Sequence, residues 1–274
     1  MSTVHGRASE GWLALREAAD AAARSPELVE TLRPHLPDEG VAVIHDLGCG
    51  TGSMARWLAV QLEGPQHWVM VDRDAALLAV AATSAPDRAA DGAPVTVETR
   101  LRDLTHLAPE DLAGSTLLTA SALLDMMTRE ELDRFVALCA RAGCPALVLL
   151  SVTGQVDLEP RDPFDDRVAD AFNAHQRRVV DGRPLLGPGA VGAAVEGFER
   201  LGAEVLVRPS PWRLGPGERD LQAQWFTGWL GAASEQDAGL TVEAAPYARR
   251  RLGEAAAGGL SVTVHHQDLL VLPA

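Results

Sequence analysis

The sequence predicts an α/β protein with an open, doubly wound and mostly parallel sheet of seven strands. Short apolar runs rich in β-branched residues alternate with segments whose apolar residues recur at helical spacing. One run, residues 146–152, is almost entirely apolar, which is typical of a strand covered by helices on both faces. A glycine-rich loop, Gly48–Gly52, follows the first such run and precedes a helical segment. In sheets of this class, ligands bind where the parallel strands end.

The N-terminal part of the chain is expected to be helical before the first strand begins. Across residues 8–35, apolar side chains such as Trp12 and Leu15 recur at helical spacing. We therefore interpret residues 1–40 as a helical N-terminal cap and residues 41–274 as the main domain.

The alternation of the two patterns gives the remaining elements in order. Strands are expected at residues 41–46, 67–71, 95–99, 116–119, 146–152, 203–208 and 261–272. Helices are expected at residues 53–63, 75–82, 130–142, 191–202, 218–234 and 242–257. The last two helices form a helical insertion, residues 218–257, before the final strand.

Residues 153–188 interrupt this alternation. The segment is polar and holds four prolines around one helical piece at residues 165–178. Because it leaves the carboxyl edge of the sheet, we expect it to form a lid over a site. A surface insertion without a functional role is the alternative.

Composition limits the classes of partner. The 274 residues include 38 acidic and 24 basic side chains, a net charge of −14, which disfavours nucleic acid because phosphate binding needs clustered cations. The three cysteines form neither a disulfide framework nor a metal-binding pattern, so we expect no metal site and a reduced, cytoplasmic environment. Apolar runs are too short for a membrane span, and the polar segment Met1–Glu10 lacks a signal-peptide core. The oligomeric state, including a homodimer, stays open.

The glycine loop reads Asp46-Leu-Gly48-Cys-Gly50-Thr-Gly52. Glycines in such a loop permit a tight turn and a close approach of the backbone to a ligand. The dinucleotide fingerprint G-x-G-x-x-G would place its third glycine at Ser53, so the spacing disfavours a bound pyrophosphate.

This loop resembles the first motif of the class I S-adenosylmethionine-dependent methyltransferases, an acidic residue followed by G-x-G-x-G after the first strand. Asp46, Gly48, Gly50 and Gly52 match that motif. The resemblance implies a Rossmann-like methyltransferase fold, S-adenosylmethionine as cofactor and S-adenosylhomocysteine as product.

Two further acidic residues stand where this family carries cofactor contacts. Asp72 ends the second strand, where the family's acidic residue binds the ribose hydroxyls, and a carboxylate can accept two hydrogen bonds from a vicinal diol. Asp103 follows the third strand, where the family's residue bonds the adenine amino group, and Leu104 supplies an adjacent backbone amide. Either aspartate alone is equally typical of a helix N-cap or a turn.

Four other residues complete the expected cofactor site, each with a structural alternative. Cys49 belongs to the loop, where it is expected to pack as a small residue, and Ala120 lies on the strand that passes the methionine end of the cofactor in this family. Arg73 is expected either against the adenosine or facing solvent. Arg16 is expected to pair with the cofactor carboxylate or an acidic substrate, or else with Asp20 one helical turn away.

The acceptor side of the site lacks a family motif. After the fourth strand the chain has Ser121, Leu124 and Asp125 instead of an Asn-Pro-Pro-Tyr-type motif, which argues against a nucleobase or protein amide as acceptor. We expect a small-molecule acceptor that takes the methyl group on oxygen or nitrogen. His175 is the first candidate for a catalytic base because its reference pKa lies near neutrality, and Asp125 is a second candidate.

Aromatic residues are candidates for the acceptor wall. These are Trp12, Phe172 and Trp212, with ordinary core packing as the alternative. Four segments that contain Trp12, Phe172, Trp212 and His266 also resemble a bacterial subgroup of class I methyltransferases, which implies no particular acceptor.

Two other functions remain open on the sequence. One is a nicotinamide-dependent, NAD(P)-using oxidoreductase on the same type of sheet, which the glycine spacing disfavours. The chain has one tyrosine, Tyr247, and no lysine, so it lacks a Tyr-x-x-x-Lys catalytic pair. The other is a protein that binds S-adenosylmethionine without catalysis.

Overall fold

A computed structural model describes residues 8–273. Residues 1–7 and Ala274 lie outside the described residues. Residues 1–7 are part of the expected N-terminal cap and of the polar segment Met1–Glu10.

The central sheet follows the order β3-β2-β1-β4-β5-β10-β8, and a short strand, β9, pairs beside β10. Its strands are β1 (Ala42–Leu47), β2 (Gln66–Asp72), β3 (Val95–Leu101), β4 (Leu117–Ser121), β5 (Ala146–Glu159), β8 (Glu204–Pro209), β9 (Trp212–Leu214) and β10 (Ser261–Leu272). Strands β1 to β5 are parallel, whereas β10 is antiparallel to both β5 and β8. The predicted mostly parallel sheet of seven strands is confirmed, with β9 in addition. Because the last strand is inserted between β5 and β8, the order departs from the 3-2-1-4-5-6 order of a dinucleotide-binding sheet.

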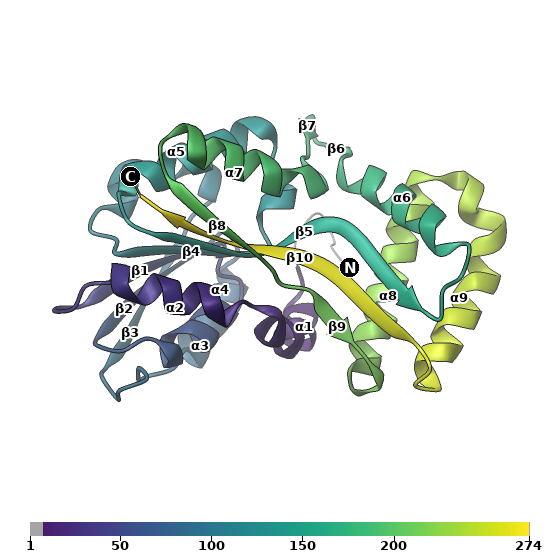
Figure 1. Ribbon diagram of the computed structural model, residues 1–274, viewed down its shortest axis with the longest axis horizontal. Coiled ribbons are helices and arrows are strands. Elements are labelled where there is room, and N and C mark those ends of the chain that lie inside the picture. The colour runs from purple at the N-terminus through teal and green to yellow at the C-terminus, as the bar shows by residue number, and fades with distance from the viewer. Residues whose placement is uncertain (1–7, 274) are drawn as a thin grey trace.

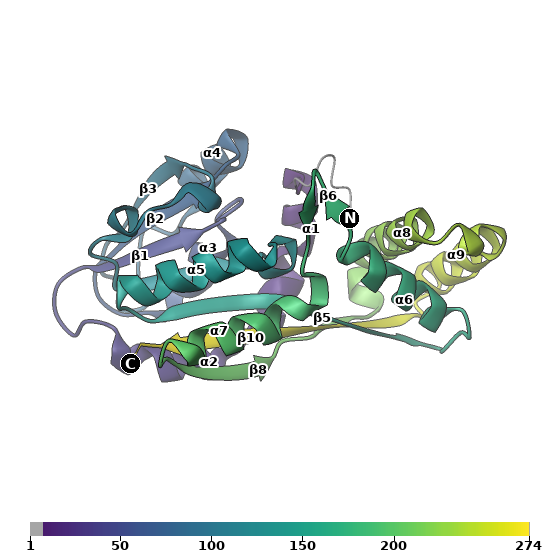
Figure 2. The ribbon, with the colours of Figure 1, turned by 90° about the horizontal axis from the view of Figure 1, so that it is seen from above.

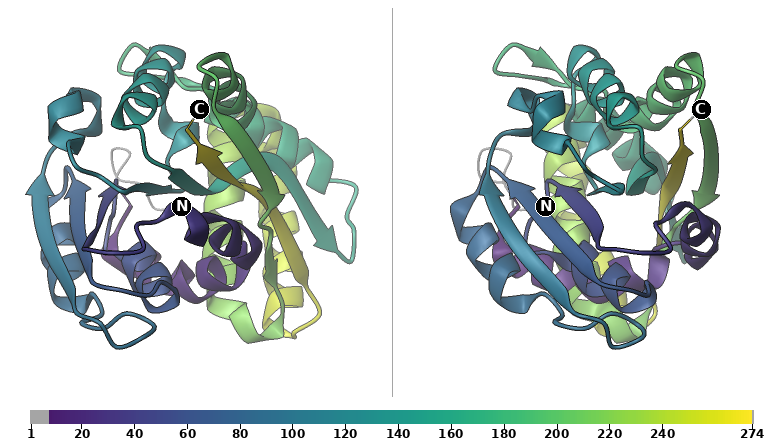
Figure 3. Two further views of the ribbon diagram at one scale, coloured as in Figure 1. Left: turned by 60° about the vertical axis from the view of Figure 1, so that its left-hand side comes forward. Right: turned by 90° about the vertical axis from the view of Figure 1, so that its left-hand side faces the viewer.

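Helices cover both faces of this sheet, as Figures 1 and 3 show. The α-helices of the described residues are α1 (Glu10–Ala23), α2 (Pro26–Leu32), α3 (Ser53–Leu58), α4 (Ala75–Ser84), α5 (Arg129–Ala142), α6 (Asp165–Gln176), α7 (Ala190–Arg200), α8 (Arg219–Gln236) and α9 (Thr241–Ala256). Along β2, Trp68 and Met70 pack towards α2, α3 and α4, while Val69 and Val71 pack towards α5 and α7. This alternation explains why the strands read as continuous apolar runs.

Residues 8–35 form two helices where one helical region was expected. Helix α1 ends at Arg24, whose ψ of 138° is not helical, and Ser25 then caps α2 by accepting a hydrogen bond from the Leu28 amide at 3.4 Å. Pro26 occupies the first turn of α2, where its missing amide hydrogen costs nothing.

Strand β5 is longer than expected and corrects the boundary at residue 153. It continues to Glu159 because β10 runs along its whole length, from the pair Ser261–Glu159 to the pair Val271–Ala146. Residues 153–159 alternate in burial and carry no apolar run, so only the partner strand reveals them. The first seven residues of the expected lid are therefore sheet.

The long ends of β5 and β10 carry a second layer of helices, α6, α8 and α9, which we name the helical lobe. Figure 1 shows the two strands running from the sheet into this lobe, and Figure 2 shows α1 standing between the sheet and the lobe. A separate apolar cluster fills the lobe, with Phe164, Trp229 and Tyr247 among its buried members. Between α6 and α7 the chain forms a small hairpin of β6 (Val179–Val180) and β7 (Arg183–Pro184).

A buried carboxylate fixes the point where β5 bends. Asp268 on β10 is fully buried and accepts hydrogen bonds from the Leu150 amide at 2.7 Å, the Ser25 amide at 2.8 Å and the Ser210 hydroxyl at 2.6 Å. Leu150 has a φ of 56°, a left-handed conformation that a residue with a side chain rarely adopts. The three bonds hold the bent strand, the start of α2 and the β8–β9 connection together.

Among the helices of residues 8–273, none has both the length and the apolar character needed to cross a membrane.

We expect Asp268→Ala to lower the free energy of unfolding by about 3 kcal/mol or more, because it leaves buried donors without an acceptor. Urea denaturation at pH 7 measures this change. Asp157→Ala is the control, because the Asp157 side chain is 56% exposed and bonds only two surface side chains, His265 on the neighbouring strand and Gln155. We expect that control to cost less than about 1 kcal/mol, and an equal loss in both variants would contradict the role given to Asp268.

Candidate functional site

The glycine loop follows β1 at the carboxyl edge of the sheet. Gly48, Gly50 and Gly52 have φ values of 74°, 54° and 82°, all in the left-handed region that favours glycine. A Cβ atom on Gly50 would lie 3.2 Å from Leu13 of α1, and one on Gly52 would lie 3.2 Å from Ala81 of α4. The loop is therefore pressed between two helices, and its glycines are required by both conformation and space.

Asp46 is the buried, penultimate residue of β1, and one of its carboxylate oxygens is satisfied. Its Oδ1 accepts a hydrogen bond from the Thr119 hydroxyl of β4 at 2.8 Å. Its Oδ2 is buried and has no hydrogen-bond partner among residues 8–273. Burial raises the pKa of Asp46 to about 7. A buried acceptor without a donor is costly in a protein alone and fits a site that a polar ligand group completes.

Asp72 ends β2 and holds the glycine loop. Its Oδ2 accepts a hydrogen bond from the Gly50 amide at 2.9 Å, and its Oδ1 accepts one from the Asp74 amide at 2.9 Å. The bond from Asp74 is that of a turn residue, the alternative considered from sequence, whereas the bond from Gly50 joins β2 to the glycine loop. A carboxylate has further acceptor sites, so these bonds are compatible with a ligand hydroxyl on the same group.

Asp103 caps a short helical turn after β3. Its Oδ1 accepts hydrogen bonds from the amide and the hydroxyl of Thr105 at 2.9 and 2.7 Å, at the start of the 3₁₀ turn Leu104–His106. The capping alternative is therefore realised. A small cavity of about 50 Å³ lies beside Leu104 and Thr105 and reaches Phe135 of α5.

Cys49 and Arg73 differ in exposure. Cys49 is buried in the loop, where burial raises the pKa of its thiol far above the physiological range, in keeping with the expected packing role. Arg73 is exposed at the surface after β2.

Helix α1 is tied to the loop by a pair of charged side chains. Arg56 of α3 donates to both carboxylate oxygens of Glu17 on α1, at 2.6 and 2.7 Å, and also to the Thr51 carbonyl within the loop. The sequence analysis missed both residues, because neither belongs to a motif and their pairing joins segments 39 residues apart.

Arg16 forms the intrahelical ion pair that was the alternative to a ligand contact. Its guanidinium donates to both oxygens of Asp20, from Nε at 2.9 Å and from Nη2 at 3.0 Å. It also lies over the ring of Trp212, 4.9 Å from the ring centroid. The Trp212 indole donates to Asp20 at 2.9 Å, so Asp20 joins α1 to β9.

Three segments of the narrower resemblance meet at Trp212. The Trp212 ring lies 6.3 Å from that of Trp12 on α1 and 5.3 Å from that of His266 on β10. Trp12 and Trp212 are each only 3% exposed, so in this structure they pack as core side chains. Burial and the nearby Arg16 lower the pKa of His266 to about 3, which keeps its ring neutral. Phe172 of α6 is partly buried against the same apolar cluster that contains Trp12 and Trp212.

The end of β4 supplies the expected acceptor-side residues. Ala120 and Leu124 are fully buried, and Ser121 accepts a hydrogen bond from Arg24 at 3.5 Å. Asp125 is half-buried, and burial of its carboxyl group raises its pKa to about 6, partly offset by a backbone hydrogen bond and by the charge of Arg16. Asp125 and Arg16 therefore share one region although they lie far apart in the sequence.

His175 lies at the contact between α6 and α8. Its Nε2 is 3.3 Å from a carboxylate oxygen of Glu235 on α8, and its Nδ1 is 3.1 Å from Arg178. Burial lowers the pKa of His175, with a further contribution from Arg178. The turn Gly187–Gly189 contacts both α6 and the 3₁₀ turn Leu124–Met126, which follows β4.

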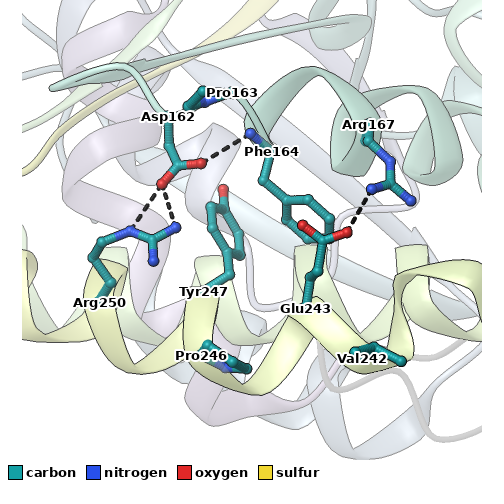
Figure 4. A pocket seen from close by; sticks show the side chains of 9 residues that line it. All are labelled: Asp162, Pro163, Phe164, Arg167, Val242, Glu243, Pro246, Tyr247 and Arg250. Carbon is teal, nitrogen blue, oxygen red and sulfur yellow. Dashed lines mark hydrogen bonds and ion pairs between the residues drawn. The ribbon is translucent and has the colours of Figure 1, made fainter.

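A cavity of about 560 Å³ opens between α6 and α9, in the helical lobe and apart from the glycine loop. Figure 4 shows Arg250 directed towards Asp162 and Arg167 directed towards Glu243, with Tyr247 between the two pairs. Each arginine that lines it is already paired, so its charge is balanced. Within the described residues, no three His, Cys, Asp or Glu side chains are grouped as a metal site requires.

One known protein family matches part of the amino-acid sequence. The family described as "Methyltransferase domain" matches residues 44–145, which include the glycine loop, Asp72 and Asp103. No curated protein matches the sequence.

Solved structures share the fold. The chain is similar to the cyclopropane synthase MmaA2 from Mycobacterium tuberculosis, at 12% identity and a TM-score of 0.50, covering 96% of this chain and 94% of that one. Two S-adenosylmethionine-dependent methyltransferases in complex with S-adenosyl-L-homocysteine, from Geobacter sulfurreducens and Thiobacillus denitrificans, are 17% and 14% identical. Their TM-scores are 0.46 and 0.47, and each comparison covers 97% of this chain and 99% of the other.

The family match, the sheet and the loop agree with one another. The matched residues contain the acidic residue and the three glycines of the loop, and the sheet brings Asp46 and Asp72 to one edge. The unsatisfied oxygen of Asp46 lies at the same edge. Residues 44–145 therefore match a methyltransferase domain, and the sheet and the glycine loop around them agree with that match.

Proposed function

We propose that the protein transfers a methyl group from S-adenosylmethionine to oxygen or nitrogen of a small-molecule acceptor. The observation that carries the proposal is the glycine loop pressed between α1 and α4, with the open Oδ2 of Asp46 beside it. The net charge of −14 supports a small molecule over a nucleic acid.

The cofactor is proposed to lie along the carboxyl edge of β1, β2 and β3. Asp46 receives the ammonium group, Asp72 the ribose hydroxyls, and Asp103 with the Leu104 amide the adenine. The turn bonds of Asp72 and Asp103 support these roles, because they hold each carboxylate in one orientation before the ligand arrives. Gly48, Cys49, Gly50, Gly52 and Ala120 form the backbone surface, and Arg73 borders the adenosine.

The acceptor is proposed to lie beyond the end of β4. Ser121, Leu124 and Asp125 form the near side, and Trp12, Phe172 and Trp212 stiffen the walls from α1, α6 and β9. Arg16, paired with Asp20 and close to Asp125, is assigned to this side, where it attracts an acidic acceptor group.

S-adenosylmethionine supplies a methyl group activated by the positive charge on its sulfur. The protein aligns the acceptor atom with the methyl carbon and keeps water out. As the new bond forms and the bond from sulfur to methyl breaks, the acceptor loses a proton. Asp125 and His175 are the two groups proposed to take this proton. A pKa of about 6 leaves Asp125 mostly ionised at pH 7, and the lowered pKa of His175 leaves its ring neutral, so each can accept a proton.

Calorimetric titration with S-adenosylhomocysteine and NADH tests the function. We expect the wild-type protein to bind S-adenosylhomocysteine and not NADH, and Asp72→Ala to weaken this binding by about 10- to 100-fold, since it removes charge-assisted hydrogen bonds. Asp91→Ala is the matched control, because Asp91 also accepts two loop amide bonds, from Gly64 and Ala93, and is not at the carboxyl edge. Binding of NADH alone, or of neither ligand by folded protein, would contradict the proposal.

We expect the affinity for S-adenosylhomocysteine to rise up to about tenfold between pH 6 and pH 8. With a pKa of about 7, Asp46 is mostly protonated at pH 6 and mostly ionised at pH 8, and only the ionised form attracts the ligand ammonium. Asp46→Asn keeps an acceptor for Thr119 and should bind weakly with little change over this range. An equally steep pH dependence in Asp46→Asn would assign the effect to another group.

We expect Asp125→Asn and His175→Gln to lower kcat by about 10²- to 10⁴-fold where the residue is the base, with S-adenosylhomocysteine affinity unchanged. Release of S-adenosylhomocysteine across a panel of small hydroxyl and amine compounds provides the assay. Asp133→Asn and Asp166→Asn are exposed controls on α5 and α6. Wild-type turnover in one of the two variants would remove that residue from catalysis.

A further inference from the structure

Arg24 is a buried cation at the junction of α1 and α2, and no sequence motif marks it. Arg24 is only 2% exposed, and its guanidinium lies over the ring of Trp57, 5.3 Å from the ring centroid. Nη1 donates to the Ser53 carbonyl at 3.1 Å, and Nη2 donates to the Ser53 hydroxyl at 3.1 Å and the Ser121 hydroxyl at 3.5 Å. Arg24 thus bridges the residue after the glycine loop and the end of β4.

The guanidinium has donors to spare. A guanidinium carries five N–H groups, and the three bonds to Ser53 and Ser121 leave two of them unused. Nε in particular is buried and has no hydrogen-bond partner among residues 8–273. An incompletely bonded charge in the interior is costly unless a counter-group completes it.

The carboxylates near Arg24 do not complete it. Asp20 is engaged by Arg16 and the Trp212 indole, and Asp268 is engaged by its three donors. Asp46 is close enough for its charge to act on Arg24, but its Oδ2 is itself without a partner. One open cationic donor and one open anionic acceptor therefore border the glycine loop.

We propose that Arg24 is a specificity-determining residue that binds the α-carboxylate of S-adenosylmethionine, opposite Asp46. The amino-acid end of that ligand carries one carboxylate and one ammonium, which matches the two open atoms in sign. A guanidinium suits a carboxylate because its N–H groups form charge-assisted bonds, and Nε of Arg24 is such a donor without a partner. This inference rests on the proposed function and assigns the carboxylate to Arg24 rather than to Arg16, whose fork is already occupied by Asp20.

The test uses a ligand that lacks only the carboxylate. Calorimetry with S-adenosylmethionine and decarboxylated S-adenosylmethionine is performed on the wild type and on Arg24→Met. We expect the wild type to prefer the complete ligand by about 10- to 100-fold and Arg24→Met to lose that preference. Its affinity for the decarboxylated ligand should change by no more than about twofold.

Two further variants keep the test decisive. Arg24→Lys retains the charge without the planar fork, so it should fold where Arg24→Met does not and should keep a smaller preference. Arg251→Met removes another buried arginine with an unpartnered Nε, but in the helical lobe beside Asp165, and should leave both affinities unchanged.

Three outcomes would overturn the inference. Equal weakening of both ligands in the Arg24 variants would make Arg24 purely structural, and loss of the preference in Arg16→Met alone would assign the carboxylate to Arg16. A wild type that binds both ligands equally would exclude carboxylate recognition while leaving the proposed function intact. Failure of the wild type to bind either ligand would instead reject the proposed function.

Discussion

The buried carboxylate of Asp268 is the constraint on which the arrangement of the site depends. It accepts hydrogen bonds from the bent strand β5, from Ser25, the N-cap residue of α2, and from the β8–β9 connection. Because Ser25 is held in this way, the preceding residue, Arg24, is directed towards the end of β4 and the start of α3. A carboxylate on the last strand thus positions a cation from the first helical region.

The site combines well-bonded groups with a few open ones. Asp72 and Asp103 are tied down by backbone amides, and Glu17 with Arg56 fixes α1 against the glycine loop. Against this rigid frame, Asp46 and Arg24 each keep one buried polar atom without a partner. A preorganised ligand site combines rigid surroundings with a few unsatisfied polar atoms. The ligand then supplies the missing hydrogen bonds, and little conformational entropy is lost on binding.

Helix α1 and the helical lobe enclose the sheet edge from two sides. The two long antiparallel strands carry the lobe beyond the sheet, and α1 stands between the sheet and the lobe (Figure 2). Trp212 receives Trp12 from α1 and His266 from β10, so the N-terminal helix is joined to the C-terminal strand by an aromatic contact. The acceptor region is therefore built from parts that lie at opposite ends of the chain.

Local pattern determined the fold class, most element boundaries and the glycine loop with Asp46 and Asp72, because each depends on residues close in sequence. The parallel strands could be predicted since burial on both faces leaves a continuous apolar run. The polar end of β5 could not, because its pairing partner lies about a hundred residues away and its own pattern resembles a loop. The same reason hid Arg24 and Arg56, and left Arg16 and Asp103 with two readings each. Only the tertiary structure shows the protein partners of these side chains, because the partner of a charged side chain is set by which distant segments the sheet brings together.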